Sequence, residues 1–124
     1  MTPKRIQLKQ QSQTLLIDFE NEGFTFTAEF LRVHSPSAEV KGHGPGQEVL
    51  QYGKKDVLIS QLERAGNYGL KIHFNDGHNS GIYTWDYFFE LGKNQENLWQ
   101  AYLQKLHNAG QSRERDTQIV KFMN

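Results

Sequence analysis

The sequence of 124 residues predicts an α+β fold, in which helices pack on a small and mainly antiparallel sheet. A strand–turn–strand–helix pattern occurs twice, at Leu15–Leu31 and again at Leu70–Phe88. A longer amphipathic helix is expected after the second copy. Fifteen aromatic residues supply the core, because each aromatic side chain buries more area than an aliphatic one. We therefore predict one domain, built from two related units and a C-terminal helix.

An edge strand is expected first, at Ile6–Leu8, within a polar and Gln-rich lead-in. The first copy of the pattern has an alternating strand at Thr14–Phe19, a turn at Asn21–Gly23 and a return strand at Phe24–Phe26. Thr27 has the type of side chain that caps helix N-termini. The apolar face of the short helix after it comprises Phe30, Leu31 and Val33.

The second copy contains the most regular strand, Leu70–Phe74. The side chains of this strand that face the core are Leu70, Ile72 and Phe74. A turn on Asp76-Gly77 connects it to a short strand at Ile82 and Tyr83. Thr84 then caps an aromatic-rich helix, which we expect to end at Gly92.

The rest of the chain adds one strand and one long helix. The apolar run at Val57–Leu62 predicts a strand ahead of the second copy. The pattern of Asn94–Asn108 predicts a helix of about four turns. Its apolar stripe, which we expect to belong to the core and not to a partner-binding surface, comprises Leu98, Trp99, Tyr102, Leu103 and Leu106. We expect the domain to occupy residues 1–110, and the mixed charges of residues 111–124 predict a flexible tail.

Two loops are candidates for function. Residues 34–47 contain three glycines and two prolines and have no periodic apolar pattern, which predicts a long loop. Loops of this length in small domains are more often functional than merely connective. Because this loop and the Asp76–Gly81 turn follow corresponding edges of the two units, we expect both on one side of the domain. The interaction surface expected there consists of Arg32, His34, Ser35, Ser37, Glu39, His43, Asp76, His78 and Ser80.

Charge and cysteine content exclude several classes of function. Fourteen basic and fourteen acidic residues balance to a formal net charge of zero, so no overall field attracts nucleic acid. A chain without cysteine has no disulfide, no thiolate nucleophile and no metal site made from its own thiolates. No apolar run approaches the roughly 18 residues of a membrane span, and no signal segment opens the chain. We therefore expect a cytoplasmic location and no membrane partner.

The loop histidines leave a choice between structural and chemical roles. His34, His43 and His78, together with Asp76, are the candidate ligands of a metal-binding alternative. We prefer the interpretation that they are solvated loop histidines, with His78 shaping its turn through a hydrogen bond, because no pair has the spacing of a known metal motif. A further alternative is a small enzyme that uses His78 and Asp76 as an acid–base pair, which requires a closed pocket. The motifs of P-loop proteins and serine hydrolases are absent, so we expect no catalytic residues and no cofactor.

One pair of motifs resembles a known family. The segments Leu31–Glu39 and Phe74–His78, with Ser80 and Tyr83 after them, are similar to the gamma-butyrobetaine hydroxylase-like N-terminal domain over about residues 5–110. Bacteria carry that domain as a short standalone protein of undetermined function, and a similar domain is fused to P-loop ATPases that handle iron–sulfur clusters. The resemblance implies a non-catalytic accessory or protein-interaction module, linked to metal or iron–sulfur protein handling, with an unidentified protein partner.

The same resemblance implies a change at the metal site of that family. In the hydroxylases, a Cys-x-Cys-x-x-Cys stretch and a histidine bind a structural zinc ion. The corresponding positions here hold Ser35, Ser37, Val40 and His78. Serine is a poor zinc ligand and valine is none, so the resemblance implies that the family zinc site is absent unless another histidine substitutes.

Overall fold

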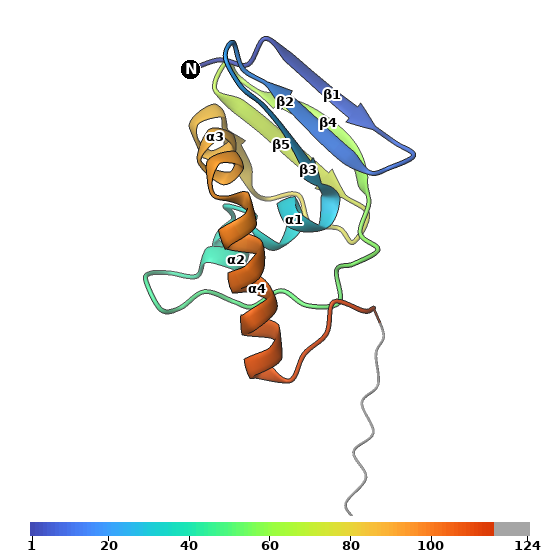
Figure 1. Cartoon of the computed structure of the whole chain (residues 1–124), viewed down its shortest axis with the longest axis vertical. Coiled ribbons are helices and arrows are strands. Elements are labelled where there is room, and N and C mark those ends of the chain that lie inside the picture. Colours follow the sequence, from blue (N-terminus) through green and yellow to red (C-terminus); the bar gives the residue numbers. More distant parts are fainter. Residues whose placement is uncertain (116–124) are drawn as a thin grey trace, which may run out of the picture.

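The computed structural model describes residues 1–115, which form two three-stranded antiparallel sheets and four helices (Figure 1). This arrangement confirms the α+β class. The elements in chain order are β1 (Arg5–Lys9), β2 (Thr14–Asp18), β3 (Gly23–Thr27), α1 (Ala28–Val33), α2 (Ala38–Lys41), β4 (Ile59–Ala65), β5 (Gly69–Phe74), β6 (Ile82–Thr84), α3 (Trp85–Lys93) and α4 (Gln95–Ala109). None of these helices is long and apolar enough to cross a membrane.

The two sheets belong to two units with the same order of elements. In each unit a three-stranded meander, β1-β2-β3 or β4-β5-β6, leads directly into a helix, α1 or α3. The strand register pairs Thr14 with Thr27 in the first unit and Gly69 with Thr84 in the second, and Thr27 and Thr84 are both helix N-caps. The predicted repeat is therefore confirmed in strand order, register and capping. It also includes a first strand, β1 or β4, in each copy.

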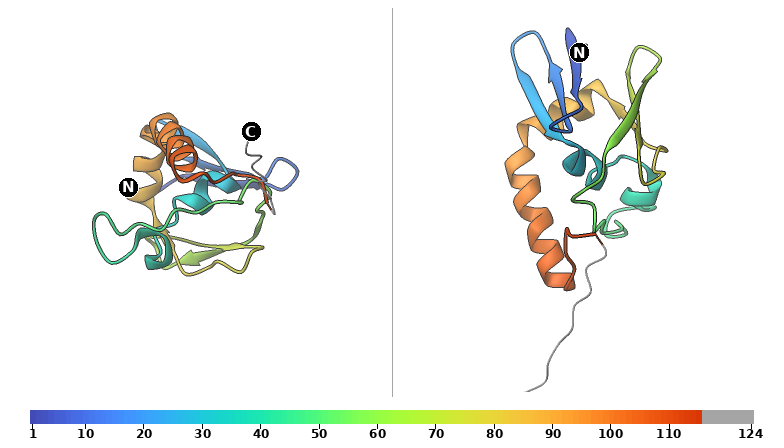
Figure 2. Two further views of the ribbon diagram at one scale, coloured as in Figure 1. Left: turned by 90° about the horizontal axis from the view of Figure 1, so that it is seen from below. Right: turned by 90° about the vertical axis from the view of Figure 1, so that its right-hand side faces the viewer.

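Phe19 and Phe74 occupy equivalent places in the repeat. Each lies five residues after the first residue of its ladder, Thr14 or Gly69, and each is buried. The sequence predicts one sheet, whereas the structure has two, which face each other with α1 and α3 between them (Figure 2). The two units meet through their apolar side chains and not through paired strands.

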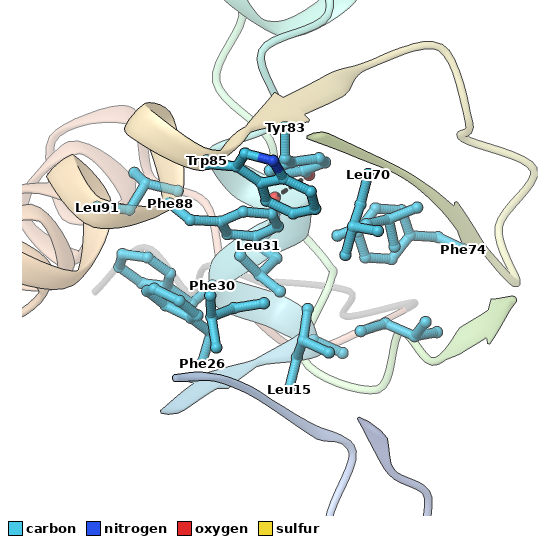
Figure 3. Packing of buried hydrophobic residues seen from close by; sticks show 14 of the residues in the cluster. Leu15, Phe26, Phe30, Leu31, Leu70, Phe74, Tyr83, Trp85, Phe88 and Leu91 are labelled. Carbon is cyan, nitrogen blue, oxygen red and sulfur yellow. Dashed lines mark hydrogen bonds between the residues drawn. The ribbon is translucent and has the colours of Figure 1, made fainter. Parts of the chain in front are cut away.

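The two units share one core of aromatic and aliphatic side chains (Figure 3). Phe26 of β3 lies against Phe88 of α3 with ring centroids 6.0 Å apart, so the units are in direct contact. Phe88 also stacks on Tyr83 at 5.4 Å. The Tyr83 hydroxyl group donates a hydrogen bond of 2.5 Å to the backbone carbonyl of Leu31 in α1. The aromatic content of the chain thus joins one unit to the other.

Both predicted N-caps are confirmed by hydrogen bonds. Oγ1 of Thr27 accepts from the backbone N–H of Phe30 at 3.0 Å, and Oγ1 of Thr84 accepts from that of Tyr87 at 3.1 Å. Each bond satisfies a backbone donor that has no partner inside its helix.

The predicted end of α3 at Gly92 is wrong, because the helix continues to Lys93 and Asn94 forms its C-cap. A Cβ atom at Gly92 would lie only 2.3 Å from Cγ of Phe24. Glycine at this position therefore allows α3 to approach β3 closely and does not terminate the helix. Asn94 is also the N-cap position of α4, which ends at Gly110 in a left-handed conformation with φ of 65°.

The apolar stripe of α4 is buried only in part. Tyr102 and Leu106 are buried and form a small second cluster with Val33 of α1. The half-buried members of the stripe are Leu98, Trp99 and Leu103. The prediction that the stripe belongs to the core is confirmed for Tyr102 and Leu106, and the other three side chains lie at the edge of the core.

The segment between the two units differs from expectation at two points. Residues 34–47 are predicted to lack regular structure, but they contain α2, a single helical turn that begins after Ser37. The strand predicted from Val57 begins at Ile59. Val57 instead lies in a turn, where its N–H donates to the carbonyl of Lys54 at 3.1 Å.

Residues 111–115 are held against the domain, although the sequence predicts a flexible tail from residue 111. The backbone N–H of Lys55 donates to the carbonyl of Arg113 at 3.0 Å. The guanidinium group of Arg113 donates two hydrogen bonds to the carboxylate of Glu29, at 2.8 and 2.7 Å. Residues 116–124, the remainder of the predicted tail, lie outside the described residues.

Candidate functional site

The two predicted functional loops meet at one place, between the α2 region and the β5–β6 connection. The hydroxyl oxygens of Ser37 and Ser80 lie 2.7 Å apart, and His78 contacts both Ser35 and Glu39. The prediction that the loops lie on one side of the domain is confirmed. We call the five residues Ser35, Ser37, Glu39, His78 and Ser80 the loop cluster.

His78 is the centre of the loop cluster. Its Nδ1 lies 3.2 Å from Oε2 of Glu39, and its Nε2 lies 2.8 Å from Oγ of Ser35. Burial lowers the pKa of His78, and the nearby charge of Arg32 lowers it further, against the opposing effect of Glu39. The neutral ring carries its proton on Nδ1, because a carboxylate can only accept. Nε2 therefore accepts a hydrogen bond from the Ser35 hydroxyl group.

Ser35 is sealed inside the protein, with 0% exposure. Its Oγ also accepts a hydrogen bond of 3.2 Å from the backbone N–H of Ser37. A Cβ atom at Gly81 would lie 2.5 Å from this oxygen, so the bare backbone of the β5–β6 connection packs directly over it.

The outer hydroxyl groups form a directed chain of hydrogen bonds. Ser80 donates to Oε1 of Glu39 at 3.2 Å. Because its one proton is used there, Ser37 is the donor in the 2.7 Å contact between Ser37 and Ser80. Oγ of Ser37 also accepts from the backbone N–H of Glu39 and caps α2. Both oxygens of the Glu39 carboxylate are thus held, while its side chain remains 70% exposed.

The order serine, histidine, carboxylate resembles the arrangement of a nucleophilic triad, but its burial does not suit catalysis. A nucleophile must reach a substrate carbon, and Ser35 has no exposed surface. The His78 side chain is only 3% exposed. The loop cluster is therefore suited to fixing two loops together and does not support hydrolysis.

A second cluster surrounds Asp76 at the start of the same connection. Oδ2 of Asp76 accepts from Nε of Arg32 at 2.9 Å and from Nζ of Lys54 at 2.7 Å. Oδ1 accepts from the backbone N–H of His78 at 3.1 Å. Burial alone would raise the pKa of Asp76, but these hydrogen bonds and the charge of Arg32 outweigh it and lower the pKa to about 2.

His78 and Asp76 do not form the acid–base pair considered from the sequence. Asp76 lines an open cavity of about 590 Å³ together with Lys54 and Tyr52, and His78 is not among the residues that line it. The carboxylate is already neutralised by two cations, and the imidazole is enclosed by Glu39 and Ser35. The cavity that Asp76 lines is open, so it is not the closed pocket that the acid–base hypothesis requires.

The other two candidate histidines lie apart from the loop cluster. His34 directs Nδ1 to the backbone carbonyl of Phe30 at 2.8 Å, and its ring lies 4.4 Å from the Phe30 ring. His43 is exposed in the loop after α2. Among residues 1–115, no group of three or more His, Cys, Asp or Glu side chains is placed to hold a metal ion. The structure therefore does not bring the three histidines together.

Three residues at these clusters were missed in the sequence. Lys54 and Gln51, which contact Asp76 and Arg32, belong to a segment without periodic pattern, so no local signal could have identified them. Gly81 could have been identified from the sequence, because a glycine beside a polar turn can indicate that another part of the chain approaches the backbone closely.

Comparison with known proteins identifies the family. A family model described as gamma-butyrobetaine hydroxylase-like, N-terminal, matches residues 6–89. This chain belongs to that family. The region that matches the gamma-butyrobetaine hydroxylase-like N-terminal family includes the whole loop cluster and both repeated units except the first residue of β1 and the last turn of α3.

Solved structures agree with this assignment. One solution NMR structure is 50% identical with a TM-score of 0.82 and covers 99% of this chain and 98% of that chain. A second is 42% identical with a TM-score of 0.78, covering 99% and 93%. A crystal structure of a DUF971-family protein of unknown function from Acidithiobacillus ferrooxidans is 29% identical with a TM-score of 0.57, covering 73% and 92%. Curated proteins give no significant match.

The residues at the positions where the resemblance implies zinc ligands do not fit a zinc ion in this chain. Ser35 and Ser37 offer hydroxyl groups, and Val40 offers no donor atom. The lone pair of His78 at Nε2 is already used by the Ser35 hydroxyl group. A hydrogen bond therefore connects the two positions at which the resemblance places a thiolate and an imidazole.

Proposed function

We propose that this protein is a non-catalytic accessory module that binds a protein partner through α2 and the β5–β6 connection. The observation that carries the proposal is the state of Glu39. Its side chain is 70% exposed, yet both of its oxygens are fixed by His78 and Ser80. A charged group that is already ordered loses little conformational entropy when it binds.

The nine residues expected to form the interaction surface differ in exposure. Arg32, Ser35, Ser37 and His78 are buried and hold the loops in place. His34 is half-buried, and the exposed members are Glu39, His43, Asp76 and Ser80. Glu39 gives this surface a fixed carboxylate, which suits an Arg or Lys side chain of the partner.

The family resemblance directs the search for that partner. Because a similar domain is fused to P-loop ATPases that handle iron–sulfur clusters, the first partners to test are proteins that handle metals or such clusters. The resemblance supplies no catalytic residue for this chain. Similarity of fold alone is weak evidence for function, so the experiment must test residues of the interaction surface directly.

Site-specific photo-crosslinking in the native host tests the proposal. A photoreactive residue in place of the exposed Asn79, beside Ser80, is expected to capture a discrete partner, and the same probe in place of Gln7 on β1 serves as the matched control. Adding Glu39→Lys should abolish capture from position 79, because it replaces the fixed carboxylate by a cation. Equal capture from both positions, or capture that Glu39→Lys leaves unchanged, would contradict the proposal.

A further inference from the structure

A groove of about 610 Å³ lies between α4 and the segment that runs from α2 to residue 51, which passes α4 in Figure 1. Its apolar lining includes Val40, Val49, Leu98, Ala101 and Tyr102. Val49 is 53% exposed, although its backbone N–H is fixed to the carbonyl of Val40 at 2.9 Å. The groove thus presents apolar surface to solvent at a defined place.

The rim of the groove is basic. Lys41 of α2 and Lys105 of α4 line it from opposite sides, and Glu48 is the single acidic residue beside them. Burial lowers the pKa of His34, which also lines the groove, and the charges of Lys41 and Lys105 lower it further. Backbone hydrogen bonds lower the pKa of Glu48, and the charges of both lysines lower it further. These four polar side chains therefore all border the groove, three of them from α2 and the segments before and after it, and Lys105 from α4.

His34 presents a free acceptor to the groove. Its Nδ1–H donates to the carbonyl of Phe30, so the lone pair of the neutral ring is on Nε2. Nε2 has no hydrogen-bond partner within residues 1–115, where every buried side-chain nitrogen or oxygen atom has one. This nitrogen atom therefore reaches solvent, and a bound ligand that lacks a donor would leave it without a partner.

We propose that the groove binds an extended peptide segment of a partner protein in which acidic and apolar side chains alternate. Successive side chains of an extended chain point to opposite sides, so apolar residues can enter the groove while acidic residues reach its rim. The apolar residues contact Val49 and Ala101, and the carboxylates pair with Lys41 and Lys105. A backbone N–H of the peptide donates to Nε2 of His34.

A peptide suits the groove better than an acyl chain. A fatty acid supplies a carboxylate and apolar surface, but its alkyl chain has no donor for His34. A basic peptide would place like charges against Lys41 and Lys105. The combination of free acceptor, apolar lining and basic rim therefore selects a ligand that is acidic, apolar and rich in N–H groups.

This inference rests on the proposed function, since it requires a protein partner, but it concerns different residues. Binding at the groove depends on Lys105 and His34, whereas the crosslinking experiment depends on Glu39. Either result can fail while the other holds. If one partner bound both the groove and the surface around Glu39, the two sites would belong to a single interface.

NMR titration of the ¹⁵N-labelled chain of 124 residues tests the groove directly. The probe is a synthetic peptide of alternating aspartate and leucine, capped at both ends. It is expected to shift the amide resonances of residues 40–51 and 98–109, which border the groove. A version with lysine in place of aspartate, and decanoate as a fatty acid, are the comparison ligands.

A pair of variants on α4 gives the matched control. Lys105→Gln and Gln100→Glu each lower the net charge by the same amount, and Gln100 is exposed but does not line the groove. Lys105→Gln should weaken peptide binding about threefold, as loss of an exposed ion pair does, whereas Gln100→Glu should leave it close to wild type. His34→Phe should also weaken it, with the Lys105 and Glu48 resonances retained as evidence that the groove is intact.

The inference is overturned by any of three outcomes. The first is that the acidic peptide shifts no groove resonances at about millimolar concentration, a range in which even weak specific complexes form. The second is that the lysine peptide or decanoate shifts them as strongly. The third is that Lys105→Gln and Gln100→Glu weaken binding equally, which would assign the effect to net charge alone.

Discussion

Each ring nitrogen of His78 has a different partner, Glu39 on one side and Ser35 on the other. Through this one side chain the β5–β6 connection is joined to the segment around α2, 39 and 43 residues away in the sequence. Both neighbours lie before the histidine in the chain, so the imidazole closes a long loop. A buried polar group of this kind costs free energy when one of its partners is removed.

The purified protein is expected to hold no stoichiometric zinc. Hydroxyl groups replace the thiolates at Ser35 and Ser37, and valine at position 40 offers no donor. Elemental analysis of protein purified without chelator measures this directly. About one metal ion per chain would contradict the prediction, and His78, His34 and His43 would then be the first ligands to replace.

The stability of the fold should depend on the ionisation of Asp76. Its pKa is lowered from 3.8 to about 2 in the folded protein. Since the folded value is the lower one, the stabilisation is full above pH 3.8 and is lost as the pH falls toward 2. Asp76→Asn should therefore be less stable than wild type at neutral pH and should lose less stability on acidification.

Urea midpoints across this pH range test the dependence on Asp76. Asp86→Asn is the matched control, because the Asp86 side chain is 86% exposed on α3. The control is expected to keep the wild-type profile. Parallel pH profiles of wild type and Asp76→Asn would show that the contacts with Arg32 and Lys54 do not stabilise the fold.

At the scale of the elements, α4 contributes few side chains to the buried core. Tyr102 and Leu106 are buried, but much of the remaining helix surface is exposed. One side of the helix packs on the two units, and the next side lines the groove described above. Position on the helix therefore decides whether a leucine stabilises the fold.

Leu106→Ala should destabilise the protein by about 2–4 kcal/mol, as removal of buried methyl groups does. Leu103→Ala should cost less, about 1 kcal/mol, because its side chain is half-buried. Urea unfolding followed by circular dichroism measures both values. Equal losses for the two variants would show that the stripe is buried along its whole length.

The segment after α4 should also contribute to stability, through Arg113. Arg113→Ala leaves the Glu29 carboxylate, whose side chain is 7% exposed, without its two hydrogen bonds, and about 1–3 kcal/mol should be lost. Lys55→Gln removes an exposed ion pair with Glu114 and should cause no measurable change. If Arg113→Ala unfolds at the same urea concentration as wild type, residues 111–115 are not anchored in solution.

At the scale of the whole molecule, the two units are not independent domains. Phe26 and Phe88 come from different units and pack together, and Tyr83 of the second unit bonds to Leu31 of the first. Neither unit buries its apolar face without the other. The repeat is therefore expected to fold as one cooperative structure.

Unfolding measured by two probes tests this cooperativity. In Trp99→Phe protein the remaining tryptophan, Trp85, is buried in the second unit and reports on that unit by fluorescence. Far-UV circular dichroism reports on both units at once. The two urea transitions should coincide, whereas separate midpoints would mean that one unit unfolds before the other.

The sequence by itself determined the local structure of this protein. The strands at 14–18 and 69–74, the caps Thr27 and Thr84, and the start of α4 after Asn94 were all predictable. These features depend on side-chain alternation and on capping groups within a few residues of each position. The α+β class followed from the same local signals, and the motif pair was enough to indicate the family.

Only the tertiary structure decided how these parts meet. It separated the strands into two sheets, packed Gly92 inside α3 against Phe24, and placed His34 at a groove and not beside His78. Each of these outcomes depends on atoms that are distant in the chain, so no local pattern records them. The loop cluster is the clearest case, because the partners of His78 are fixed only when the two units dock.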